Sequence, residues 1–313
     1  MKNLNDKSFK LKQSDIDSII SLFSSGELKK SLEQASTLIK DYPEESILFN
    51  IQGACFAGLD QPDAAVKSYE KAIMLKPDYA KAYYNLGGIL HEIGNLNESV
   101  NSFQKALNIE PNHAEAHNNL GNVLRDLEEL DEAAKSFENA INIKPDYIEA
   151  RYSLAIIFHQ TGNLDSIKHL EKIITLKPNF AEAHNILGVE LKAVGQLNES
   201  VKSYKKAIDI NQNYAEAHNN LGNVLIELEH LDDAVQAYRR ALAINPDFPT
   251  FHNNLGNALR KNGELNNAVK SYQEALTLNN EYADSHNNLG VAFFDLNQLE
   301  DALGSYTKAI KID

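Results

Sequence analysis

A fixed interval between glycines constrains this chain more than any other feature. Gly53, Gly87 and Gly121 lie 34 residues apart, Ala155 occupies the next slot, and after a step of 33 residues the series resumes at Gly188, Gly222, Gly256 and Gly290. Prolines follow the same interval at Pro43, Pro77, Pro111 and Pro145, and Pro178 comes 33 residues later. A period of this length indicates stacked copies of one supersecondary unit rather than a single globular core.

Nine repeats result when this glycine is taken as position 8 of each unit. Residues 1–11 are then an N-terminal tail, and 12–45 is a degenerate repeat. The other eight are 46–79, 80–113, 114–147, 148–180, 181–214, 215–248, 249–282 and a truncated 283–313. Since solenoids normally end in a polar terminal helix, we expect either further chain after the last repeat or a partner that covers it.

Apolar residues recur three and four apart within each repeat, which predicts two amphipathic helices per unit and an all-α fold. In repeat 114–147 the two apolar stripes are Leu120, Val123, Leu124 and Leu127, then Ala133, Phe137, Ala140 and Ile141. Asn-x-x-Glu at 112–115, 179–182 and 213–216, and Asp-x-x-Glu at 146–149, predict capping boxes at the first helices.

The repeated residues are Leu at position 7, Gly at 8, Ala or Ser at 20, an aromatic ring at 24, Ala at 27 and Pro at 32. This pattern resembles the tetratricopeptide repeat, strongly over 46–313 and weakly over 12–45. The resemblance implies a right-handed α-solenoid, a superhelix of stacked helix-turn-helix units. It also implies that positions 2, 5, 6, 9, 12 and 13 line a concave groove.

Asparagine is concentrated at these groove positions. An Asn side chain offers both a donor and an acceptor, so a row of them can bind the backbone of an extended peptide whatever its sequence. We therefore predict peptide contacts from position 6 (Asn85, Asn119, Asn220, Asn254 and Asn288) and from position 9 (Asn122, Asn223 and Asn257). The alternative is that these are ordinary solvated positions, although Asn is a mediocre helix residue.

The Asn-Asn-Leu-Gly-Asn sequences at 118–122, 219–223 and 253–257 are similar to the repeat arm of O-linked N-acetylglucosamine transferases. That resemblance implies that the position-6 asparagines hold substrate polypeptide. Ile51, Ser153 and Ile186 interrupt the row, so we expect a short segment at 85–122 and a longer one at 219–288.

A carboxylate clamp of the chaperone-binding type needs Lys at position 5, where this chain has Asn or Tyr. The charges at positions 12 and 13 are of both signs, so they favour neither an anionic nor a cationic ligand.

Five histidines share position 4: His117, His184, His218, His252 and His286. Packed helices lie about 10 Å apart, too far for neighbouring repeats to share a metal ion. We therefore expect these side chains to pack between first helices, and we predict no metal site and no cofactor.

The composition of the chain argues against several classes of function. A formal net charge of −14 disfavours nucleic acid as a partner, and Cys55 has no second cysteine for a disulfide, which suits the cytoplasm. The sequence has no apolar run long enough for a membrane span or signal peptide, and no nucleophile, base and orienting group outside the repeat pattern.

We therefore predict a protein-protein interaction scaffold that binds extended polypeptide, with no catalysis by residues 1–313 alone. One alternative is the substrate-recruiting arm of a larger glycosyltransferase or sulfotransferase. Another is self-association through the last repeat, with Phe293, Phe294, Leu303 and Tyr306 as candidate contacts.

Overall fold

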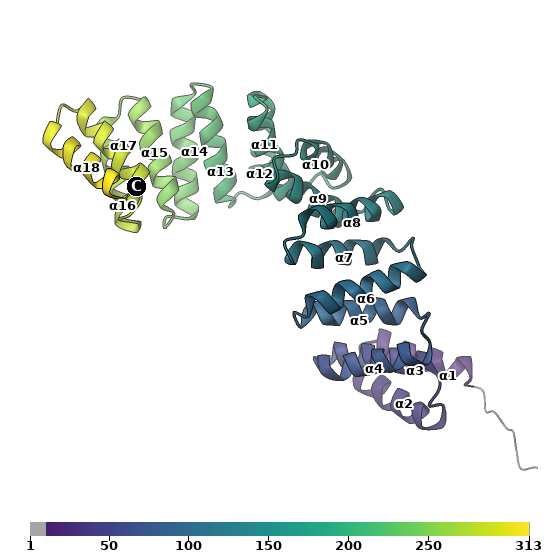
Figure 1. The fold of residues 1–313 in the computed structure, drawn as a ribbon. Helices are drawn as coiled ribbons and strands as arrows, with labels where there is room; N and C mark the ends of the chain where they lie inside the picture. Colours follow the sequence, from purple (N-terminus) through teal and green to yellow (C-terminus); the bar gives the residue numbers. More distant parts are fainter. Residues whose placement is uncertain (1–10, 313) are drawn as a thin grey trace, which may run out of the picture. The chain divides into compact units, whose positions relative to one another are not determined.

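A computed structural model describes residues 11–312, and in this range the chain is entirely helical (Figure 1). Its 18 helices are α1 (Gln13–Ser24), α2 (Leu28–Asp41), α3 (Ser46–Gly58), α4 (Pro62–Leu75), α5 (Ala80–Glu92), α6 (Leu96–Ile109), α7 (Ala114–Asp126), α8 (Leu130–Ile143), α9 (Ile148–Gln160), α10 (Asp165–Leu176), α11 (Ala181–Ala193), α12 (Leu197–Ile210), α13 (Ala215–Glu227), α14 (Leu231–Ile244), α15 (Pro249–Lys261), α16 (Leu265–Leu278), α17 (Ala283–Asp295) and α18 (Leu299–Ile312). The all-α prediction is confirmed. None of these helices is long and apolar enough to cross a membrane.

The chain forms two compact units, one ending at Ile157 and the other beginning at Phe158. In the first unit, consecutive helices from α1 to α8 pack against each other, and α1, α3, α5 and α7 also contact one another in turn. In the second unit, consecutive helices from α10 to α18 pack in the same way, and α11, α13, α15 and α17 form the equivalent row. We call the surface of each row its first-helix face.

The two helices of a hairpin meet where the glycine of position 8 faces the ring of position 24. A Cβ atom built on Gly222 would lie 2.7 Å from the ring of Tyr238, and one on Gly256 would lie 2.5 Å from the ring of Tyr272. Carbon atoms in contact normally lie 3.5–4.0 Å apart, so only glycine fits. Both rings are fully buried.

The hairpin of repeat 148–180 departs from this pattern at both positions. Ala155 replaces the glycine and Leu170 replaces the ring, and both side chains are fully buried. Where position 24 has no ring, as in this repeat, position 8 is not glycine.

In several hairpins, a serine near the start of the second helix donates a hydrogen bond to the backbone of the first helix. The hydroxyl of Ser99 donates to the carbonyl of Gly87 at 2.7 Å, and that of Ser200 donates to the carbonyl of Gly188 at 2.6 Å. These bonds satisfy buried hydroxyls at the point where the two helices are closest.

The predicted capping boxes are not formed at the helices whose caps the structure gives. The N-cap residues of α7, α11 and α13 are His113, Phe180 and Tyr214, one residue after the predicted asparagine. Phe180 and Tyr214 give no side-chain cap, whereas His113 Nδ1 accepts from the backbone N–H of Ala116 at 2.9 Å. The aromatic ring at the N-cap packs instead, as where the ammonium of Lys177 lies 4.6 Å from the ring centre of Phe180.

Gly222→Ala tests the close contact inside a hairpin. Because the ring of Tyr238 is buried and cannot move aside, we expect this variant to lose about 1–3 kcal/mol of unfolding free energy. The measurement is urea unfolding followed by circular dichroism.

Tyr238→Leu is the partner variant, since it reproduces the residue pair of repeat 148–180. In the Tyr238→Leu background, Gly222→Ala should cost clearly less than in the wild type. Equal costs in the two backgrounds would contradict the contact.

Candidate functional site

The position-6 asparagines join each repeat to the one before it. Their side-chain amides donate to the side-chain carbonyl of the asparagine at position 5 of the preceding repeat. The distances are 3.0 Å from Asn85 to Asn50, 3.2 Å from Asn220 to Asn185, 3.0 Å from Asn254 to Asn219, and 3.1 Å from Asn288 to Asn253. The position-5 acceptors are buried, and the donors are half-buried on the first-helix face.

Asn119 differs because position 5 of the preceding repeat is a tyrosine. Its amide donates to the hydroxyl of Tyr84 at 3.1 Å, and its own carbonyl accepts from Asn118 at 3.3 Å. The next position 6 is Ser153, and the buried Oδ1 of Asn118 has no hydrogen-bond partner within the described part of the chain. The row is therefore interrupted after Asn119, at the place where the sequence predicts an interruption.

Two position-9 asparagines are held by the hairpin that carries them. The hydroxyl of Tyr238 donates to Oδ1 of Asn223 at 2.7 Å, and the hydroxyl of Tyr272 donates to Oδ1 of Asn257 at 2.8 Å. Burial raises the pKa of Tyr272 to about 12, so its hydroxyl remains a donor at neutral pH. Asn122 lacks this restraint because the ring in its repeat is Phe137, which has no hydroxyl.

These bonds leave different groups of the two rows free. In the second unit, each position-6 amide uses one N–H internally and keeps its carbonyl oxygen and second N–H for a ligand. Asn223 and Asn257 use the carbonyl oxygen internally and keep both N–H groups. The second unit therefore presents acceptors and donors in neighbouring rows, which is the complement of a peptide backbone.

Polar contacts also join adjacent repeats on this face, from position 12 to position 13 of the next repeat. Two are ion pairs, and the contact of His91 is a hydrogen bond. Nε2 of His91 lies 2.7 Å from Asp126, Nζ of Lys192 lies 2.7 Å from Glu227, and Nη1 of Arg260 lies 3.2 Å from Asp295. The mixed charges seen in the sequence are thus largely arranged as pairs.

Each unit has a cavity on its first-helix face. In the first unit it measures about 330 Å³ and is lined by residues including Lys81, Tyr84, Asn85, Glu110 and His113. In the second unit it measures about 460 Å³ and is lined by Lys192, Asn223, Ile226, Glu227, Tyr238, Asn254, Asn257, Arg260 and Lys261. Four of the eight predicted peptide-binding residues thus line a cavity, namely Asn85, Asn223, Asn254 and Asn257.

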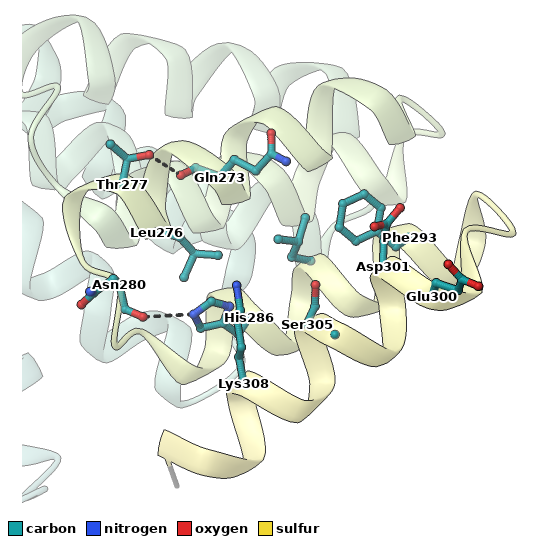
Figure 2. Close-up of a pocket in the computed structure, with 12 residues that line it drawn as sticks. Gln273, Leu276, Thr277, Asn280, His286, Phe293, Glu300, Asp301, Ser305 and Lys308 are labelled. Atoms are coloured by element: carbon teal, nitrogen blue, oxygen red, sulfur yellow. Dashed lines mark hydrogen bonds between the residues drawn. The ribbon is translucent and has the colours of Figure 1, made fainter.

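A different cavity lies in the last repeats, between α16, α17 and α18 (Figure 2). It measures about 540 Å³, and Leu276, Leu289 and Phe293 supply its apolar lining. Figure 2 shows Glu300 and Asp301 near one end and Lys308 beside His286.

The residues predicted for self-association differ in how far they are exposed. Phe294 and Leu303 are exposed, whereas Phe293 and Tyr306 are partly buried, and Tyr306 packs against Gly290.

The position-4 histidines contact a loop, which the sequence did not predict. Each Nε2 lies within hydrogen-bond distance of the carbonyl oxygen six residues earlier, at the proline slot of the preceding repeat. The distances are 2.9 Å for His117 and Pro111, 3.0 Å for His184 and Pro178, 3.3 Å for His218 and Gln212, 2.8 Å for His252 and Pro246, and 3.0 Å for His286 and Asn280. Arg151, in the same slot, donates to Pro145 at 2.8 Å.

Sequence reasoning named the asparagines as candidates but missed the groups that orient them. The available signal was that position 24 is Tyr, not Phe, in the repeats that carry Asn223 and Asn257. The polar contacts between positions 12 and 13 were missed for a similar reason, since their partners lie 35 residues apart and not at equal repeat positions.

The pH dependence of stability tests the histidine row. Burial lowers the pKa of His184 and of His218 below the ordinary value of about 6.5. The unfolded chain then binds protons before the folded chain does, so stability is present above about pH 6.5 and is lost as the pH falls through it.

Urea unfolding at pH 7.5 and pH 5.5 measures this loss. The double variant His184→Gln, His218→Gln removes both titrating groups, so its stability should fall less between the two pH values than that of the wild type. An identical fall would show that these two histidines do not cause it.

Comparison with known proteins matches most of the chain to one repeat family. A family model described as "TPR repeat" matches residues 60–94, 87–124, 121–162, 188–228, 222–263 and 256–296. A second model, described as "Tetratricopeptide repeat", matches residues 283–313. Together these segments cover more than half of the sequence.

Among curated proteins, a peroxisomal targeting signal receptor of Candida albicans is 32% identical over 77 residues, which are 25% of this chain and 13% of the receptor. The match thus covers only a small part of that relative.

Two solved structures share the fold. The crystal structure of MamA protein aligns with a TM-score of 0.51 and 26% identity, and covers 54% of this chain and 93% of MamA. The structure of YrrB, described as a TPR protein with an unusual peptide-binding site, aligns with a TM-score of 0.54 and 23% identity. It covers 58% of this chain and 95% of YrrB, and at this identity the likeness concerns the fold alone.

Proposed function

Because the chain belongs to the tetratricopeptide repeat family, whose repeats serve protein-protein interaction, we propose that it is a scaffold that binds extended polypeptide along its first-helix faces. The proposed contacts are Asn85, Asn119 and Asn122 in the first unit, and Asn220, Asn223, Asn254, Asn257 and Asn288 in the second.

The observation that carries the proposal is that the two asparagine rows of the second unit leave carbonyl oxygens free in one row and N–H donors free in the other. Carbonyl oxygens of Asn220, Asn254 and Asn288 can accept from backbone N–H groups of a ligand. The N–H groups of Asn223 and Asn257 can donate to its backbone carbonyls. Because both rows are fixed by internal hydrogen bonds before a ligand arrives, little side-chain entropy is lost on binding.

Backbone recognition of this kind suits a polypeptide that is already extended. Main-chain hydrogen bonds supply affinity, while cavities between them supply preference for particular side chains. The curated relative is a receptor for a peroxisomal targeting signal, and recognition of a polypeptide segment by these repeats agrees with that description.

A substrate-recruiting arm of a larger enzyme would bind its substrate polypeptide through the same contacts. We place the protein in the cytoplasm, where its single, buried Cys55 would stay a thiol.

The triple variant Asn220→Ala, Asn254→Ala, Asn288→Ala tests the position-6 row. It removes three ligand contacts, and at about 0.5–1.5 kcal/mol per hydrogen bond we expect peptide affinity to fall at least tenfold. The probe is a library of unstructured, dye-labelled peptides about 15 residues long, which can span several repeats, and the measurement is fluorescence anisotropy.

The triple variant Asn101→Ala, Asn139→Ala, Asn266→Ala is the matched control, because it removes exposed asparagines of second helices. Circular dichroism at the assay temperature must show both variants folded, since the first leaves Asn185, Asn219 and Asn253 without a donor from position 6. Equal affinity of both variants and the wild type would overturn the proposal.

A further inference from the structure

We propose that the cavity of the second unit's first-helix face, lined by Asn223, Asn257, Lys192, Arg260 and Lys261 among others, binds an anionic side chain of the bound polypeptide. This inference rests on the proposed function and adds a side-chain preference to it. It concerns a side chain within an extended segment, contacted by positions 9, 12 and 13 of the repeats.

Two neutral groups of this cavity, Asn223 and Asn257, are oriented as donors, whereas Asn254 keeps its side-chain carbonyl oxygen as an acceptor. Tyr238 and Tyr272 hold the carbonyl oxygens of Asn223 and Asn257, at 2.7 Å and 2.8 Å. Both N–H groups of each amide therefore remain for a ligand. A donor that is already oriented loses less side-chain entropy on binding than a mobile one. By orienting the two amides, the tyrosine hydroxyls therefore favour binding of an acceptor in this cavity.

The charged groups of the cavity are mostly cations. Lys192, Arg260 and Lys261 line it together with one acid, Glu227. Glu227 already pairs with Lys192 at 2.7 Å, and Arg260 contacts Asp295 through one terminal nitrogen, which leaves other guanidinium N–H groups available.

Lys261 is the cation of this cavity best placed to attract a ligand. It is exposed, and no ion pair with an acid is formed by it in the described structure. The chain has a formal net charge of −14, but the cations that line this cavity outnumber its acids, so an anion is attracted here.

Four other cavities of the described structure lack this combination. Two of them include His218 and Arg240 together with Asp209, and neither has a tyrosine-held amide. The first unit's cavity includes Lys81 and Glu110 but has no tyrosine-held amide. The cavity in Figure 2 has Glu300 and Asp301 among its lining residues. We therefore assign the preference for an anion to the face of α11, α13 and α15.

Carboxylate and phosphate groups would both satisfy these donors, so the test includes both. It uses peptides of one neutral sequence about 15 residues long, with a single central residue that is Gln, Glu, Ser or phosphoserine. The wild type should bind the Glu or the phosphoserine peptide about fivefold or more tightly than its neutral counterpart, and the difference should shrink at high salt.

Lys261→Glu reverses the charge of the exposed side chain and leaves the asparagines unchanged. We expect it to abolish the preference while the affinity for the Gln peptide stays within about twofold. Asn257→Ala should weaken the preference through loss of the fixed donors. Lys270→Gln, which removes an exposed cation from the second helix α16, is the control and should change nothing.

The outcomes separate this inference from the proposed function. Equal binding of all four peptides by the wild type, or an unchanged preference in Lys261→Glu, would overturn the anion site and leave backbone binding intact. Failure of every peptide to bind would overturn both.

Discussion

The contact between a glycine and an aromatic ring inside most hairpins is the constraint on which the rest of the molecule depends. It brings two helices so close that a Cβ atom would overlap the ring, as at Gly256 and Tyr272. The ring of Tyr272 also has a hydroxyl, which donates to Asn257 on the first-helix face. The same side chain therefore fills the core and orients a surface amide.

Asparagine plays a structural role and a binding role in the same array. The buried position-5 residues accept hydrogen bonds that connect neighbouring repeats, and this removes the cost of burying their carbonyl oxygens. The position-6 residues complete those bonds and still have an acceptor and an N–H to offer. The competing interpretation, that Asn here is only a solvated residue, does not account for these hydrogen bonds between repeats, such as that from Asn254 to Asn219.

The period of the sequence was sufficient to predict the helices, because spacing of glycines and apolar residues determines where hairpins can form. First helices begin at Ser46, Ala80 and Ala114, at the starts of predicted repeats. The capping boxes were wrong because an aromatic residue, such as Phe180, occupies the N-cap and is used for packing. The hydrogen bonds of the position-4 histidines were not predicted, because the period of the sequence does not show which loop carbonyl a side chain reaches. The orientation of the amides could not be predicted, because it depends on which atom of Asn257 a tyrosine hydroxyl reaches.

The central claim is that backbone atoms of an extended polypeptide bind the two asparagine rows. A crystal structure with a bound peptide from the library tests it most directly. The account predicts an extended chain along α13, α15 and α17, with peptide N–H groups donating to the side-chain carbonyls of Asn254 and Asn288, and peptide carbonyls accepting from Asn223 and Asn257. A peptide bound on the second helices, or one that contacts the first-helix face through side chains alone, would contradict it.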